Sequence, residues 1–123
     1  MQNQNSKSKT DLKRRAYQYS IGVIEFLDTL PKDSSSQVIA KQLLRSATSM
    51  GANVVEAKGA SSKRDFTNFF SHSLKSANES LYWLGLLRDA KKINNPQLEY
   101  LSNETKELAN MLGSSILTLK GKK

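Results

Sequence analysis

The sequence lacks several residue types on which common protein chemistries depend. It has no cysteine and only one histidine, His72. Without cysteine there are no disulfides, no thiolate metal sites and no cysteine nucleophile, and a reducing compartment suits such a chain. No window approaches the roughly 20 apolar residues of a membrane-spanning helix, and the first ten residues lack the apolar segment of a signal peptide. We therefore expect a cytoplasmic protein.

Catalytic motifs are equally scarce. A single histidine cannot form a two-histidine zinc site, and the chain lacks the Glu-x-x-His motifs that a di-iron helical bundle requires. It has neither a Gly-x-Ser-x-Gly nucleophile elbow nor a Gly-x-x-x-x-Gly-Lys phosphate loop. The sequence therefore predicts no enzymatic activity, no metal site and no cofactor.

What is present is helical periodicity. Apolar residues recur at steps of three and four, the spacing of one helix face, over most of the 123 residues. Caps and breakers predict four helices: about Asp11 to Thr29, about Ser36 to Lys58, from the Ser62 capping box to about Lys92, and from Asn95-Pro96 to Leu119. Short links make consecutive helices antiparallel. The prediction is an all-α, up-down-up-down antiparallel four-helix bundle over residues 11–119, with a disordered polar tail (1–10) and a basic C-terminal tail (120–123).

Each expected helix carries an apolar stripe for the core. In the first helix the stripe is Leu12, Ala16, Tyr19, Val23, Phe26 and Leu30. In the third it is Phe66, Phe70, Leu74, Ala77, Leu81, Leu84 and Leu87, and in the fourth Leu98, Leu101, Thr105, Leu108, Leu112, Ser115 and Leu119. The alternating steps of the fourth stripe are typical of helices that pack at a shallow angle.

Apolar residues beyond these stripes suggest self-association. The first helix has a second row, Tyr17, Ile21 and Ile24, and the third has Phe69, Tyr82, Trp83 and Leu86. Each helix also has one interior glycine, which costs about 1 kcal/mol relative to alanine and is offset where helices approach closely. A four-helix bundle needs one buried face per helix, so we expect a homo-oligomer that uses the first and third helices.

The basic residues gather at one end of the expected bundle. The formal net charge is +8, with 19 Lys and Arg against 11 Asp and Glu. The antiparallel topology places at one pole Asp11, Glu56 and Asp65 together with eleven basic residues: Lys7, Lys9, Lys13, Arg14, Arg15, Lys58, Lys63, Arg64, Lys120, Lys122 and Lys123. The other charges cancel, so this pole carries the whole net charge. We predict that it binds RNA or DNA through phosphate contacts, with little base reading.

A polar group between the second and third helices has a different expected role. Arg45, Asn53, Glu56 and Glu79 could form a site, but a structural network of salt bridges and hydrogen bonds suits them better.

The segment from Leu44 to Ala90 resembles a known family. Its Arg45-Ser46-Ala47, Ser49-Met50 and Asn53-Val54-Val55-Glu56 are similar to the Arg-Ser-x-x-Ser-Ile-x-x-Asn-Ile-x-Glu-Gly stretch of the four-helix-bundle proteins encoded within intervening sequences of bacterial 23S rRNA genes. The following helix resembles that family at Ser62, Phe66, Phe70, Ser73 and Glu79. One departure is Glu56-Ala57-Lys58-Gly59 in place of Glu-Gly, which implies a longer second helix.

A sister group, the accessory variability proteins of diversity-generating retroelements, is similar at Leu112-Gly113-Ser114-Ser115-Ile116 and in the lysine-rich tail. The resemblance implies a homopentamer, and it does not imply catalysis. Two functions follow as expectations: an RNA-associated homo-oligomeric bundle, or an adaptor that binds a reverse transcriptase and its RNA.

Overall fold

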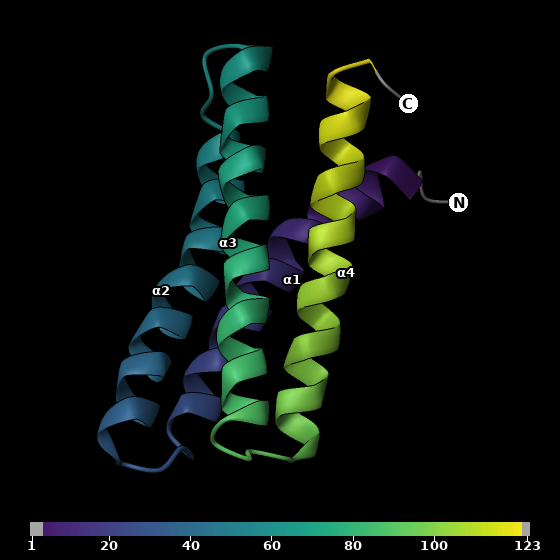
Figure 1. Ribbon diagram of the computed structural model, residues 1–123. Helices are drawn as coiled ribbons and strands as arrows, with labels where there is room; N and C mark the ends of the chain where they lie inside the picture. The colour runs from purple at the N-terminus through teal and green to yellow at the C-terminus, as the bar shows by residue number, and fades with distance from the viewer. Residues whose placement is uncertain (1–3, 122–123) are drawn as a thin grey trace.

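The protein is a bundle of four long helices. The computed structural model describes the backbone of residues 4–121 and the side chains of residues 12–121. The helices are α1 (Gln4–Leu27), α2 (Ser34–Ala57), α3 (Lys63–Asp89) and α4 (Pro96–Leu119). The α1–α2 and α3–α4 connections lie at one end of the bundle, and the α2–α3 connection and the end of α4 lie at the other (Figure 1). The predicted all-α, up-down-up-down fold is confirmed.

Side-chain caps begin three of the helices. Asp33 caps α2, Ser62 caps α3 and Asn95 caps α4, each accepting a hydrogen bond from the backbone amide three residues later, at 3.3, 3.0 and 2.8 Å. Pro96 occupies the start of α4, where a missing amide hydrogen costs nothing. The expected roles of Ser62 and Asn95 are confirmed, whereas α2, expected to begin at about Ser36, begins at Ser34 and is capped by Asp33. At its other end α2 stops at Ala57, with Lys58 as its C-cap.

The first helix begins earlier than expected. We predicted a disordered tail over residues 1–10, but α1 starts at Gln4. The segment contains no proline or glycine, and extending an existing helix adds a hydrogen bond per residue without a new nucleation step. In Figure 1 the first half of α1 leans away from α2 and α3 and passes behind α4, so the start of α1 projects to the side of the bundle.

The core follows the predicted stripe closely in α1, where all six expected residues are at most 4% exposed. In α3 the buried face is rotated from the prediction: Leu74 and Leu81 are half-buried, and Ser73 and Ser80 are fully buried in their place. In α4, Ile116 is buried where Ser115 was expected.

Close packing of α2 against α3 explains the rotated face. These two helices form the most extensive pair in the bundle. The Ser73 hydroxyl donates to the Met50 carbonyl at 2.7 Å, and the Ser46 and Ser80 hydroxyl oxygens lie 2.8 Å apart. Small hydroxyl side chains let the backbones approach and satisfy each other's hydrogen bonds, so they replace larger leucines at the contact.

A second buried hydrogen bond joins α1 to α4. The hydroxyl oxygens of Tyr19 and Thr105 are 2.6 Å apart, and both residues are almost fully buried. Burial raises the pKa of Tyr19 to about 12, because the phenolate form would lose its hydration. Polar side chains from all four helices thus meet at the middle of the core.

Among the described residues, no helix combines the length and apolarity that crossing a membrane would require.

Candidate nucleic-acid interface

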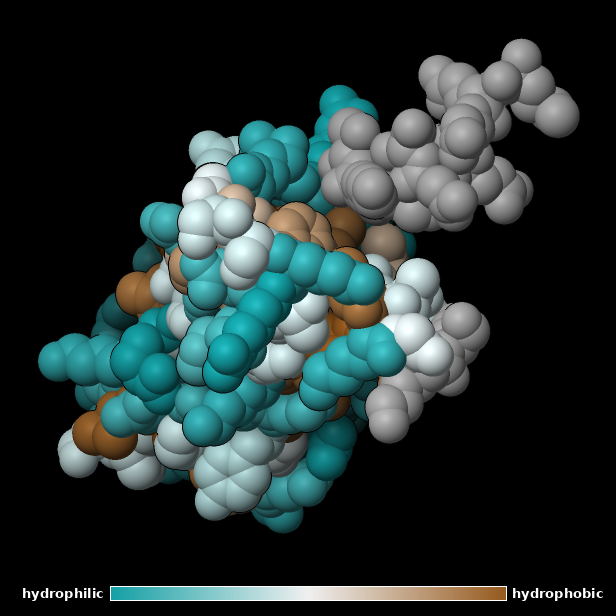
Figure 2. Space-filling model, turned by 90° about the horizontal axis from the view of Figure 1, so that it is seen from above, coloured by the Kyte–Doolittle hydropathy of each residue, from teal (hydrophilic) through white to brown (hydrophobic). Residues whose placement is uncertain are grey.

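The end of the bundle that holds the α2–α3 connection is rich in cations; we call it the basic pole. It is defined by six side chains that the structure describes: Lys13, Arg14, Lys58, Lys63, Arg64 and Lys120. All six are exposed. Figure 2 looks onto this end, where hydrophilic residues cover most of the described surface and apolar atoms show between them. The side chains of Lys7, Lys9, Lys122 and Lys123 lie outside the described residues.

Cations from different helices come close together at this pole. The pKa of Lys58, just beyond the end of α2, is lowered chiefly by the positive charge of Lys13 on α1. Lys63 and Arg64 occupy the first turn of α3, and Lys120 directly follows α4. The helical topology therefore brings together charges that are more than 40 positions apart in the sequence.

Few nearby carboxylates neutralise these cations. None of the six forms an ion pair with any carboxylate in the described part of the chain. The carboxylate of Asp65 accepts a hydrogen bond from the Ser61 hydroxyl at 2.7 Å and does not contact a lysine or arginine. The pole therefore presents positive charge to solvent.

The start of α3 carries both signs of charge. The Asp65 amide already donates to the Ser62 hydroxyl and the Asp65 carboxylate lies in the first turn, but the remaining amides of a helix N-terminus still attract anions. Lys63 and Arg64 sit in this first turn, where positive side chains are unfavourable by a few tenths of a kcal/mol to about 1 kcal/mol. These two cations therefore lower the stability of α3 slightly and increase the attraction of this end of the helix for anions.

Arg15 does not belong to this surface. Its guanidinium donates to Glu104 of α4 at 2.6 and 2.9 Å and to Glu107 at 3.1 Å, and its side chain is only 25% exposed. The hydrogen bond to Glu104 is the main cause of its raised pKa. The structure therefore places Arg15 in a contact between α1 and α4. Its neighbours Lys13 and Arg14 lie on other sides of the same helix and are exposed.

The predicted polar network forms only in part. Arg45 of α2 pairs with Glu79 of α3, whose carboxylate also accepts a hydrogen bond from the Trp83 indole at 2.9 Å. The Asn53 amide donates to the Ser49 carbonyl at 2.8 Å, within its own helix. The Glu56 side chain is exposed and makes no hydrogen bond or ion pair with the described residues.

The opposite end of the bundle differs in charge pairing. Lys91 donates to Asp33 at 2.8 Å, and Arg88 pairs with the adjacent Asp89 at 2.7 Å. The pKa values of both carboxyl groups are lowered, in each case chiefly by the hydrogen bond from the basic partner. We call this end the neutral pole.

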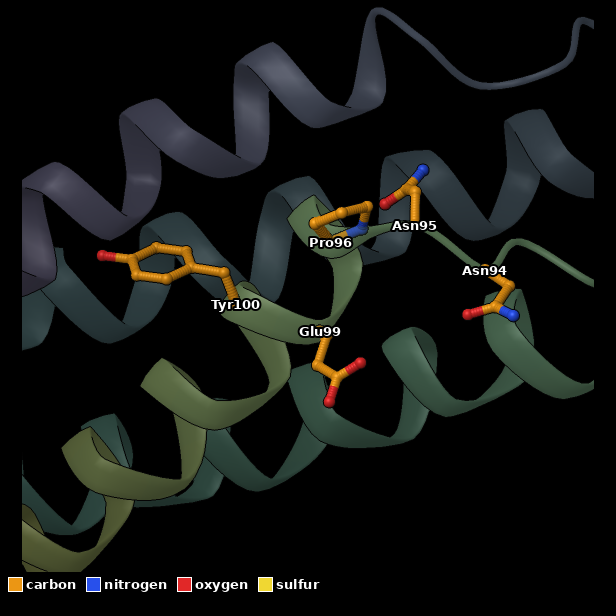
Figure 3. Close-up of a pocket in the computed structure, with 5 residues that line it drawn as sticks. All are labelled: Asn94, Asn95, Pro96, Glu99 and Tyr100. Atoms are coloured by element: carbon orange, nitrogen blue, oxygen red, sulfur yellow. The ribbon is translucent and has the colours of Figure 1, made fainter.

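A shallow hollow of about 420 Å³ lies at the neutral pole, where α4 begins (Figure 3). Asn94, Asn95, Pro96, Glu99 and Tyr100 line it. The Asn95 side chain is already engaged as the cap of α4, and the Glu99 carboxylate would repel a phosphate. In the part of the chain that the structure describes, no three Asp, Glu, His or Cys side chains are grouped as metal ligands.

Comparison with known proteins agrees with these features. The profile of the 23S rRNA-intervening sequence proteins matches residues 8–114, which include α2 and α3 in full and most of α1 and α4. The chain belongs to the 23S rRNA-intervening sequence protein family. The predicted resemblance to that family is therefore confirmed.

A solved structure supports the same assignment. This family member is similar to a protein of unknown function from the S23 ribosomal protein family of Bacteroides thetaiotaomicron, with 35% sequence identity and a TM-score of 0.81. The similarity covers 89% of this chain and 97% of that one. No curated protein sequence matches the chain.

One feature of this family member could not be found from sequence pattern alone. A second hollow, of about 570 Å³, lies between α1 and α2 beside the basic pole. Gly51 and Ala52 of α2 and Tyr17 of α1 are among the residues that line it. The sequence assigns Tyr17 only to the second apolar row of the first helix, because it does not show which small residues of α2 lie opposite this side chain.

Proposed function

We propose that this protein binds nucleic acid, and RNA in particular, through phosphate contacts at the basic pole. The observation that carries the proposal is a group of six exposed cations that lie on α1 and α3 or directly follow α2 and α4. They have no carboxylate partner in the described part of the chain. Lys7, Lys9, Lys122 and Lys123 belong to the same proposal from their sequence positions. Membership of a family named for intervening sequences of 23S rRNA supports RNA as the ligand.

Phosphate binding predicts a particular dependence on salt. Each neutralised phosphate releases condensed counterions and contributes about −0.7 to the slope of log affinity against log salt for single strands, and about −0.9 for duplex DNA. A pole with several cations therefore binds weakly at high salt. Lysine and arginine charges without an ordered network of base contacts give little sequence selectivity.

We also propose that the protein functions as a homo-oligomer, a ring of five. Support comes from large apolar side chains that are exposed on α1 and α2, namely Ile21, Ile24, Leu44 and Val38, which are 36 to 59% exposed. Of the row expected on α3, Phe69 and Trp83 pack against the core, Leu86 is half-buried and only Tyr82, at 60%, is exposed, so most of the exposed aliphatic side chains form a strip on α1 and α2. Sedimentation of the concentrated protein should give an oligomer and no monomer.

Matched charge reversals test the RNA proposal. One variant combines Lys13→Glu, Lys63→Glu and Arg64→Glu at the basic pole, and the control combines Lys32→Glu, Lys41→Glu and Lys92→Glu at or near the neutral pole. All six residues are exposed and free of ion pairs with the described residues, so both variants change the net charge equally. Binding to a single-stranded RNA is measured by fluorescence anisotropy across a salt series.

We expect the basic-pole variant to lose binding and the control to weaken it only slightly, through its effect on net charge. Circular dichroism and light scattering should show unchanged helicity and size for both. Equal losses would mean that the location of the charge is irrelevant. If the unmodified protein binds no RNA at low salt, the adaptor for a reverse transcriptase becomes the working hypothesis, tested by co-purification with that enzyme.

A further inference from the structure

The hollow between α1 and α2 adjoins the basic pole and has an unusual lining. Lys13 and Arg14 lie at one side of it, and the ring of Tyr17 stands beside them on α1. Tyr17 is 67% exposed, the most exposed large hydrophobic side chain among the described residues. An aromatic ring and two cations therefore border one cavity.

Small residues of α2 make room for this cavity. A Cβ atom at Gly51 would lie 3.5 Å from the Ala16 carbonyl oxygen, so the two backbones are already close at this point. Gly51 and Ala52 fill little of the space between the helices, and they line the hollow together with the larger side chains of Tyr17 and Val55, of which Val55 is 51% exposed. The resulting volume of about 570 Å³ lies within the roughly 300 to 1,000 Å³ of pockets that hold small organic groups.

The hydroxyl groups of the hollow are poor at reading base edges. Ser20 donates its proton to the Ala16 carbonyl at 3.2 Å, and Thr48 donates to the Leu44 carbonyl at 2.8 Å. Both hydroxyls can then only accept hydrogen bonds from a ligand. The lining favours a flat apolar group attached to an anion, with little discrimination among such groups.

We propose that this hollow binds one unpaired nucleobase of the RNA, stacked on Tyr17, while Lys13 and Arg14 contact the adjoining phosphate. This inference rests on the proposed function and makes it more specific, since a base held in a helix cannot enter the hollow. The protein accordingly prefers single-stranded RNA. The lowered pKa of Lys58 beside Lys13 fits an anion site, because a phosphate there would relieve the repulsion between the two lysines.

A second copy of the chain is the competing occupant. The cations at the rim argue against it, since another copy would bring its own basic pole, and two of the carboxylates at the neutral pole are already paired, Asp33 with Lys91 and Asp89 with Arg88. The apolar strip of Ile21, Ile24, Leu44 and Val38 continues from the hollow towards the neutral pole, away from these cations, and suits a subunit contact better.

The test compares Tyr17→Ala with Tyr100→Ala. Tyr100 is a matched control because it is 62% exposed and also borders a hollow, but its neighbour there is Glu99 and not a cation (Figure 3). Affinities are measured for an oligouridine of about 12 nucleotides and for an RNA duplex of the same length. Loss of one base–aromatic stack should lower the affinity of Tyr17→Ala for the single strand by about five- to hundredfold.

The duplex affinity of Tyr17→Ala should change less than about twofold, and Tyr100→Ala should match the unmodified protein for both ligands. Tyr17→Phe should retain single-strand binding, because the ring and not the hydroxyl makes the stack. Ala52→Leu, at an exposed position of α2, fills the hollow while leaving Tyr17 and the cations in place, and it should reduce single-strand binding in the same way.

Equal losses for strand and duplex, or the same small effect from both tyrosine variants, would overturn the base site while leaving salt-dependent RNA binding intact. If Tyr17→Ala or Ala52→Leu dissociates the oligomer in light scattering, the hollow is a subunit contact and the inference is wrong. Absence of binding by the unmodified protein to either RNA would instead contradict the proposed function itself.

Discussion

The two ends of the bundle contain similar kinds of residues but use them differently. At the neutral pole, Lys91 and Arg88 each bond to a carboxylate, whereas none of the six described cations of the basic pole pairs with one. The core differs much less. Leu87 and Leu101, towards the neutral pole, and Ala57 and Leu112, towards the basic pole, are all at most 1% exposed, and only single side chains such as Ile116, at 9%, keep more of their surface exposed. The charge pattern therefore separates the two ends more clearly than the packing does.

The largest expected effects concern single core side chains towards the two ends. Leu87→Ala should lower the free energy of unfolding by about 2 to 5 kcal/mol, because the Leu87 side chain is fully buried and its truncation leaves a closed cavity. Ile116→Ala should cost less than about 2 kcal/mol, because the Ile116 side chain lies in the last turn of α4 and keeps 9% of its surface exposed, so a shorter side chain there leaves a smaller closed cavity. Urea unfolding followed by circular dichroism measures both values, and equal costs would contradict the difference in burial between these two side chains.

Substitutions of Arg14 and Arg15, which are adjacent in α1, should separate effects on stability from effects on RNA binding. Arg15→Ala should destabilise the protein by about 1 to 3 kcal/mol, because it leaves the Glu104 carboxylate, whose side chain is only 12% exposed, without its charged partner. Arg14→Ala should change stability by less than about 0.5 kcal/mol, because Arg14 is exposed.

RNA binding should show the reverse order for the same two variants. Arg14→Ala should weaken binding and reduce the magnitude of the salt slope by about 0.7 for a single strand, whereas Arg15→Ala should leave the slope unchanged. Denaturant titration measures the stability of each variant, and fluorescence anisotropy on the same samples measures its affinity for RNA. A reduced salt slope for Arg15→Ala would return that residue to the binding surface.

The smallest effect concerns the charges of the neutral pole. Asp33 has a lowered pKa in the folded protein, so the unfolded chain binds more protons as the pH falls through the ordinary carboxyl value of 3.8. The stabilisation is therefore complete above that pH and is lost progressively below it. Asp33→Asn retains a good N-cap for α2 but lacks the pairing with Lys91, and it should flatten the acid dependence of the melting temperature. An unchanged acid profile would show that the pair contributes nothing measurable.

Several features of the fold could be predicted because their causes are local in sequence. Ser62 and Asn95-Pro96 mark helix starts through side-chain and proline chemistry, and the stripe from Leu12 to Leu30 identifies the buried face of α1 by spacing alone. The candidate interface was predicted in the same way, since short links between helices dictate which ends of the helices come together.

Other features depended on which residues face each other across the bundle. The serines at 73 and 80 are buried in α3 because α2 approaches closely there, and Arg15 pairs with Glu104 because the first half of α1 leans behind α4. Neither contact has a local signal: a serine beside a leucine, or an arginine after another arginine, has the same sequence appearance whether it is buried, paired or free.

The sequence by itself determined the number of helices, the places where α3 and α4 begin, the antiparallel order of the helices and the separation of charge between the two poles. Each of these follows from propensity, capping, chain length and charge, which act over a few residues at a time. Only the tertiary structure decided the rotation of α3, the partner of Arg15 and the hollow beside Tyr17. Those depend on the distance and tilt between helices, which are set by the packing of side chains far apart in the chain.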